Sequence, residues 1–177
     1  MLKRMSACVL FFGIVTPLSA AADDSLVKFK GGVGVHPVSN VAGAQNTDGT
    51  FPNVTRNVVR GVNPAGQIWV IADLRADVKA DGLGSIKVRG KGLLLAGGNA
   101  IGTNAGARVF ATLICDAAGT QRTTSLTGVP LEANGDFRID DVLTPAPVDC
   151  ASPVLLIRNA GNQTWFAAGF QNLDNDD

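Results

Sequence analysis

The sequence predicts an all-β fold, and three observations predict it. Between Gln67 and Gly97 apolar residues recur at every second position, which is the period of a strand with one face in a core. Short strand-like segments bounded by Gly, Pro, Asn and Asp follow one another along the rest of the chain. No segment after residue 22 keeps a helical period over about ten residues. This pattern favours two packed antiparallel sheets, and we expect an immunoglobulin-like β-sandwich, with a jelly roll or a β-barrel as the alternatives.

Residues 1–22 have the three regions of a secretory signal peptide, in the usual order. Lys3 and Arg4 supply the charge, Val9–Val15 is apolar, and Ala20–Ala22 supplies small residues for cleavage. The apolar run is too short for a membrane span, and no second run approaches the length of about 18 residues that suggests one. We therefore expect a secreted or periplasmic protein without a transmembrane segment.

The remainder of the chain predicts one domain over residues 23–171, followed by an acidic, mobile tail over residues 172–177. Removing the signal peptide takes away two of the 15 basic residues, so 13 remain against 15 acidic residues, a net charge near −2. A chain of this charge does not suggest a nucleic acid as partner.

The mature chain keeps two cysteines, Cys115 and Cys150. In an oxidising compartment an isolated pair of cysteines usually forms a disulfide, and we expect one here. Neither tryptophan lies between these cysteines, so the Cys–Trp–Cys order of true immunoglobulin domains is missing.

The central hairpin carries enough charge to predict its register. Its core-facing positions are even-numbered in both arms, and Asp81–Gly84 supplies the turn. A register that places Val78 opposite Ile86 also pairs Asp77 with Lys87, and at its open end it places Trp69 opposite Leu95, which we expect to be buried on both faces. The same register leaves Arg75 opposite Arg89, a pair of like charges.

The other strands are expected between turn signals. Gly31–Gly32 predicts a bend or bulge in the first strand, and the polar segment Pro37–Pro52 is expected to be a loop. A two-residue turn at Ala160–Gly161 would pair Leu156 with Trp165 in a closing hairpin. The expected strands outside the central hairpin are Leu26–Lys30, Val33–Val35, Val54–Arg60, Arg108–Cys115, Arg122–Leu126, Phe137–Val142, Val154–Arg158 and Thr164–Phe170.

Few residues offer catalytic chemistry. His36 is the single histidine, so any Ser-His-Asp arrangement must use it, and it stands in V-H-P at the end of a strand. Asp136, Asp140 and Asp141 lie close in sequence, and paired carboxylates can act as acid and base or bind calcium. Adjacent residues of a strand point to opposite faces, however, so Asp140 and Asp141 should diverge. The sequence contains no recognised motif for a metal or cofactor, and we expect neither.

Two further features suggest ligand binding less directly. Trp69 and Trp165 could offer aromatic platforms for a sugar, although their apolar strands favour core packing. The loop Ala96–Gly106 superficially resembles a phosphate loop, but a strand rather than a helix follows it and it lacks the lysine.

Four stretches carry a resemblance that covers most of the mature chain: GGVGVHPVS, TRNVVRGVNPAGQIWVIADLRADVKADG, KGLLLAGG and PVLLIRNAG…WFAAGF. In overall texture they resemble a group of small secreted bacterial proteins of unassigned function. The resemblance implies secretion and a β fold, and it implies no activity and no site residue.

The sequence therefore favours a secreted or periplasmic, non-catalytic binding or structural module, with the contacts carried by loops such as Ala96–Gly106 and Pro37–Pro52. The partner is open, with a protein or a cell-envelope component as candidates. One alternative is a hydrolase that uses His36 or the group of Asp136, Asp140 and Asp141. Another is a subunit that joins a larger assembly through a strand edge.

Overall fold

A computed structural model describes residues 24–37, 39–42, 44–49 and 53–173. The expected signal peptide and residues 174–177 of the expected tail lie outside these residues. The described part of the chain contains thirteen strands and no helix, so it holds no helix that could cross a membrane. The strands are β1 (Ser25–Gly34), β2 (Ser39–Ala42), β3 (Asn53–Arg56), β4 (Trp69–Val70), β5 (Asp73–Lys79), β6 (Ser85–Lys91), β7 (Leu94–Leu95), β8 (Arg108–Ile114), β9 (Gln121–Thr123), β10 (Val129–Pro130), β11 (Phe137–Val142), β12 (Val154–Asn159) and β13 (Trp165–Gln171).

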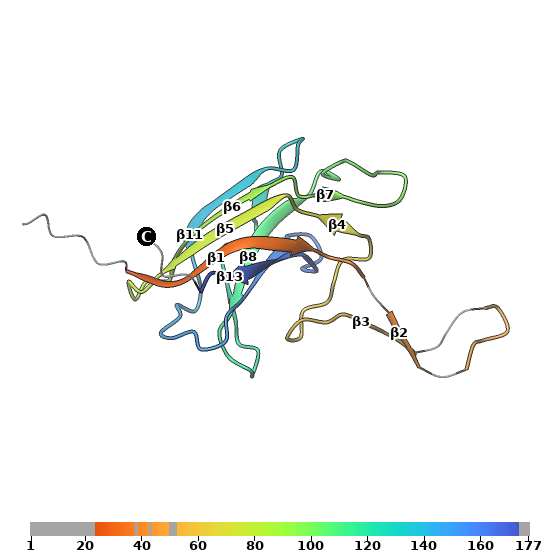
Figure 1. Ribbon diagram of the computed structural model, residues 1–177, viewed down its shortest axis with the longest axis horizontal. Coiled ribbons are helices and arrows are strands. Elements are labelled where there is room, and N and C mark those ends of the chain that lie inside the picture. The colour runs from red at the N-terminus through yellow and green to blue at the C-terminus, as the bar shows by residue number, and fades with distance from the viewer. Residues whose placement is uncertain (1–23, 38, 43, 50–52, 174–177) are drawn as a thin grey trace, which may run out of the picture.

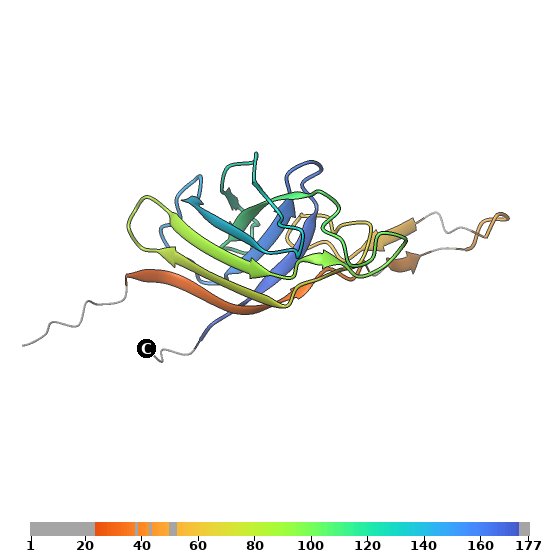
Figure 2. The same ribbon diagram turned by 90° about the horizontal axis from the view of Figure 1, so that it is seen from above.

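Nine of these strands form one antiparallel sheet in the order β10-β8-β12-β13-β1-β5-β6-β11, with β9 also paired to β8. The sheet curls so that its two ends approach each other (Figures 1 and 2). Thr123 at the end of β9 and Thr144 beyond β11 exchange two backbone hydrogen bonds, of 3.0 and 2.9 Å. The fold is therefore all-β, with one nearly closed, barrel-like sheet. The immunoglobulin-like sandwich is not confirmed, whereas the barrel alternative is compatible with this sheet.

The core lies on the concave side of this sheet, where alternate residues of neighbouring strands meet. Phe29, Ala76, Val88 and Ile139 come from four adjacent strands, lie opposite one another and are all buried. The alternation of buried and exposed residues leaves the outer face of β1, β5, β6 and β11 to charged side chains.

The central hairpin has the predicted register. Val78 lies opposite Ile86 and Asp77 opposite Lys87. The pair of β4 and β7 continues the same register, because Trp69 lies opposite Leu95. Charge pairing and face parity were therefore sufficient to fix the pairing of these strands.

Both arms of the hairpin are interrupted at the same level, which separates β4 from β5 and β6 from β7. Gly92 takes a φ of +65°, in the left-handed region. Beyond the break Trp69 and Leu95 are buried, whereas Val70 is 43% exposed. The expectation that this end is buried on both faces is therefore wrong, because the break exchanges the inward and outward positions and leaves one face open.

The first strand is bulged, as the paired glycines predict. Phe29 lies opposite Gln171, but Gly32 lies opposite Gly169, so the register between β1 and β13 shifts by one residue. Gly31, between them, takes a φ of +84°. A residue with a Cβ would be strained in that conformation.

The closing hairpin differs from its predicted pairing. Leu156 lies opposite Ala168 rather than Trp165. The connecting turn is longer than two residues, because the N–H of Gln163 donates to the carbonyl of Asn159 at 2.9 Å and Gln163 takes a φ of +59°. A glutamine rarely takes the left-handed conformation, so the longer turn has no sign in the sequence, and the predicted two-residue turn is wrong.

The expected loop Pro37–Pro52 is also wrong in part, because it contains β2. This strand pairs with β3, with Ser39 opposite Arg56, and the pair lies at one end of the molecule, away from the main sheet (Figure 1). A four-residue strand is too short to display a period, so its pairing could not be read from the sequence.

Candidate functional site

The candidate catalytic residues do not form a cluster. His36 is exposed just beyond β1, and its backbone carbonyl accepts a hydrogen bond from Asn57 at 2.9 Å. Asp140 is level with Lys28 of β1, through Lys87 and Asp77. Three strand spacings, roughly 14 Å, therefore separate Asp140 from the strand that leads to His36.

The acidic residues have local partners instead. Asp141 accepts a hydrogen bond from the backbone N–H of Ser125 at 2.8 Å, which helps to join the two ends of the sheet. Asp136 accepts one from the N–H of Gly92 at 3.0 Å, beside the break in the hairpin. Asp140 points outward on β11, as the alternation predicts. In the described residues no three His, Cys, Asp or Glu side chains gather as they would around a metal ion.

Both tryptophans pack in the interior. Trp69 is 3% exposed and its ring stacks on Phe166, with the ring centroids 3.9 Å apart. Trp165 is 5% exposed, and its indole N–H donates to the carbonyl of Asn57 at 3.4 Å. Pro64 forms a backbone bridge to Trp165, so the segment that precedes β4 pairs with the start of β13. Neither tryptophan is a surface platform for a sugar.

The predicted disulfide between Cys115 and Cys150 is present. Cys115 follows β8 directly, and Cys150 lies in the loop that enters β12, the neighbour of β8. The bond therefore ties the entry of one strand to the exit of the adjacent strand.

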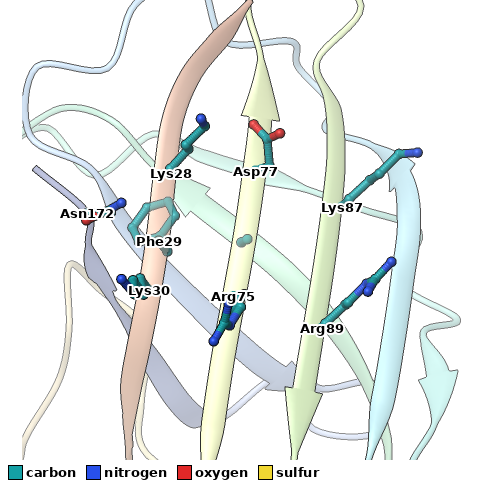
Figure 3. A pocket seen from close by; sticks show the side chains of 9 residues that line it. Lys28, Phe29, Lys30, Arg75, Asp77, Lys87, Arg89 and Asn172 are labelled. Carbon is teal, nitrogen blue, oxygen red and sulfur yellow. The ribbon is translucent and has the colours of Figure 1, made fainter. Parts of the chain in front are cut away.

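The outer face of the sheet carries a line of positive charges. Lys30 lies opposite Arg75, Arg75 opposite Arg89, and Arg89 opposite Arg138. All four side chains are exposed. We call these four residues the cationic row; it crosses β1, β5, β6 and β11 at one level. Figure 3 shows Lys30, Arg75 and Arg89 at this level on three adjacent strands.

The positions on either side of the cationic row have mixed charge. On one side, Lys28, Asp77, Lys87 and Asp140 lie opposite one another and alternate in sign. On the other side, Asp73 of β5 lies opposite Lys91 of β6. The excess of positive charge is therefore confined to a single line across the strands.

Nearby acids only partly neutralise the row. Asp73 is 3.3 Å from Arg75, and Asp140 is 3.9 Å from Arg138. Within the described part of the chain, Lys30 and Arg89 form no ion pair.

Asp77 belongs to the neighbouring line of Lys28, Asp77, Lys87 and Asp140, and its carboxylate already has partners. Its carboxylate lies 2.9 Å from the ammonium of Lys79 and accepts a hydrogen bond from the hydroxyl of Ser25 at 2.6 Å. Hydrogen bonds to Asp24 first, and then to Asp77, raise the pKa of Lys79 above its ordinary value. Lys79 and Ser25 therefore hold the carboxylate of Asp77 on the side away from the cationic row.

A shallow hollow of about 350 Å³ lies over part of the cationic row. Three residues of the row line it, namely Lys30, Arg75 and Arg89 (Figure 3). The rest of its lining consists of Lys28, Phe29, Ala76, Asp77, Lys87 and Asn172. The hollow thus has five basic residues and one acidic residue in its wall, which suits an anion that keeps part of its hydration.

A second hollow, of about 780 Å³, opens at the end of the barrel-like sheet. The stacked pair Trp69 and Phe166 forms part of its wall, beside Ala105 and Gly106 of the glycine-rich loop. We call this space the barrel-end hollow. Both aromatic rings are almost fully buried, so the apolar part of its lining that a ligand can reach comes mainly from Leu126, which is 49% exposed, and from alanines.

Sequence reasoning missed the cationic row. The conflict between Arg75 and Arg89 was its one visible sign, because both residues belong to the same hairpin. Lys30 and Arg138 join them only through the order of strands in the sheet. No protein-family model, curated protein or solved structure matches this chain significantly.

Proposed function

We propose that this chain is a secreted or periplasmic, non-catalytic binding module that takes an anionic ligand on the outer face of its sheet. The observation that carries the proposal is the cationic row, in which four positive side chains lie opposite one another on adjacent strands. The ligand would therefore contact the outer face of the sheet rather than the loops Ala96–Gly106 and Pro37–Pro52, which the sequence suggested.

The energetic cost of the row supports a role in binding. Like charges placed directly opposite each other on a sheet are destabilising, by a few tenths of a kcal/mol or more for each pair. Proteins often keep such unfavourable local arrangements at functional sites, where activity or binding compensates for the lost stability. An anion that bridges the four side chains would remove the repulsion.

The disulfide supports an extracytoplasmic location, since such bonds persist mainly in oxidising compartments. The hydrolase alternative is not favoured, because His36 lies apart from the acids on β11. The strand-edge alternative is not favoured for the main sheet either, because the hydrogen bonds between Thr123 and Thr144 partly join its two ends.

Calorimetric titration of the purified protein with inorganic tripolyphosphate, a short linear anion, tests the proposal. We expect saturable binding that weakens as salt is added. Arg89→Gln should lower the affinity up to about fivefold, since an exposed charge pair contributes up to about 1 kcal/mol. Lys91→Gln is the matched control, because it makes the same charge change two residues along the same strand. Absence of binding, or an equal loss in both variants, would show the proposal to be wrong.

A further inference from the structure

We infer that the ligand of the cationic row is a linear acidic polysaccharide, a sugar chain that bears carboxylate or sulfate groups, which lies across the strands. This inference rests on the proposed anion-binding function and names its ligand class. It depends on three features of the outer face: the shape of the row, the charges beside it, and an exposed aromatic ring at its end.

The row has the shape of a track for an extended chain. Adjacent strands are about 4.8 Å apart, so four aligned cations extend over roughly 14 Å. The hollow over the row is shallow and lies between side chains of three strands, so it does not enclose a small ligand (Figure 3). A polymer with regularly spaced anions can contact all four cations, whereas a single phosphate or sulfate reaches one or two.

The neighbouring charges restrict the ligand to one line. On one side Asp77 and Asp140 alternate with Lys28 and Lys87, and on the other side Asp73 lies opposite Lys91, so these flanking lines carry no net charge. A flat array of anions, such as the surface of an acidic membrane, would gain no net attraction from the flanking lines. A single polymer chain along the row contacts only the line with an excess of positive charge, so the charge pattern favours a chain over a membrane surface.

An exposed aromatic ring lies at the β13 end of the row. Phe29 lies opposite Gln171 and Gly32 opposite Gly169, so Phe170 faces the bulge that contains Lys30 and Gly31. Phe170 is 54% exposed, and its ring lies 3.4 Å from the point where a Cβ on Gly31 would be. An exposed ring beside a line of cations offers an apolar face to one unit of the ligand, in addition to charge.

This combination favours a sugar chain over other linear anions. Inorganic polyphosphate has no apolar face that could use the ring. A single-stranded nucleic acid is typically bound by several aromatic side chains along its track. Here one exposed ring lies at the end of four charges, which suits a chain whose units carry both an anionic group and an apolar face.

The first test is a length series. Oligogalacturonates of one to eight units carry one carboxylate on each sugar, and their affinities for the purified protein can be measured by calorimetry at about 0.15 M salt. We expect the affinity to rise steeply up to about four units, as the number of cations predicts, and then to level off. An affinity that does not change between one and eight units would overturn the inference while leaving an anion site in place.

The second test separates sugar recognition from charge. Phe170→Ala should lower the ratio of the affinity for octagalacturonate to that for tripolyphosphate about fivefold, since covering part of an exposed ring with the apolar face of a sugar contributes about 1 kcal/mol. Phe170→Leu keeps the apolar surface without the ring, and it replaces the first variant if that one does not fold. An unchanged ratio in the folded variants would overturn the inference.

Two competitors complete the experiment. Single-stranded DNA and anionic lipid vesicles, each supplied at the same total charge as octagalacturonate, should displace it only at much higher concentration. Equal displacement by either would overturn the choice of a polysaccharide. If tripolyphosphate also fails to bind, then the proposed function itself fails, and the two failures are thereby distinguished.

Discussion

Replacing Arg89 should stabilise the protein while it weakens binding. Arg89 has a like charge opposite it on both sides, Arg75 on β5 and Arg138 on β11. Two unit charges about 5 Å apart in water repel by roughly 0.8 kcal/mol, and physiological salt screens part of this repulsion. Arg89→Gln removes two such repulsions, so we expect the free energy of unfolding to rise by about 0.5–1 kcal/mol.

Lys87→Gln is the control, because it should change stability in the opposite direction. Lys87 lies on the same strand and the same exposed face, but its opposite neighbours are Asp77 and Asp140. Its ammonium is 3.5 Å from the Asp140 carboxylate. Removing this charge therefore removes attraction, and we expect a loss of a few tenths of a kcal/mol.

Urea unfolding of the two variants and the parent protein measures both effects as shifts of the midpoint at constant slope. Added salt should raise the stability of the parent protein more than that of Arg89→Gln, because salt screens the repulsion that the variant lacks. If Arg89→Gln is destabilised as Lys87→Gln is, then the row is not under electrostatic strain and the reasoning fails.

Three further predictions concern the scaffold. Gly34→Ala should cost at least about 2 kcal/mol, because its Cβ would lie 2.0 Å from a backbone carbonyl oxygen of β4, whereas Gly66→Ala, with no atom within 4 Å, should be nearly neutral in the same urea assay. Replacing Cys115 and Cys150 together with alanine should cost about 3–4 kcal/mol, from the 35-residue separation that the disulfide closes, and an unchanged midpoint would contradict this. Hydrogen bonds from the Ser85 hydroxyl and then from backbone N–H groups hold the pKa of Asp81 below its ordinary value, so its contribution is present above about pH 4 and is lost as the pH falls through the lowered pKa. The stability advantage of the parent protein over Asp81→Asn should therefore shrink in acid, and a constant difference from pH 7 to pH 3 would refute the assignment.

The sequence predicted those parts of the fold that depend on local pairing. In the central hairpin, face parity excluded every second register, and the attraction between Asp77 and Lys87 selected among the rest. The bulge at Gly31 was visible because paired glycines interrupt an otherwise apolar strand. The disulfide followed from the count of cysteines, since only Cys115 and Cys150 remain once the expected signal peptide, which contains Cys8, is set aside.

The features that the sequence did not predict depend on long-range pairing or on unusual backbone conformations. The closing hairpin was misplaced because Gln163 takes a left-handed conformation that glutamine seldom adopts. The break at Gly92 exchanges the faces of the hairpin, and nothing in the apolar pattern on either side reveals it. The curling of the sheet brings Thr123 and Thr144 together, and this closure cannot be read from the separate strands.

The candidate site shows the same division. The opposition of Arg75 and Arg89 was predicted, because both belong to one hairpin. The addition of Lys30 and Arg138 requires that β1 pairs with β5 and that β11 pairs with β6, which are contacts between strands that the sequence alone did not order. Phe170 joins the row only through the true register of β13. The unfavourable pair of Arg75 and Arg89, in an otherwise well-supported register, was therefore the one sequence signal of the cationic row.

The most direct test of the account is to locate the ligand on the protein. Nuclear magnetic resonance of the isotopically labelled protein, titrated with tripolyphosphate, should show saturable changes centred on Lys30, Arg75, Arg89 and Arg138. Changes centred on the barrel-end hollow, beside Trp69 and Phe166, or the absence of any saturable change, would contradict the claim that the cationic row is the binding site.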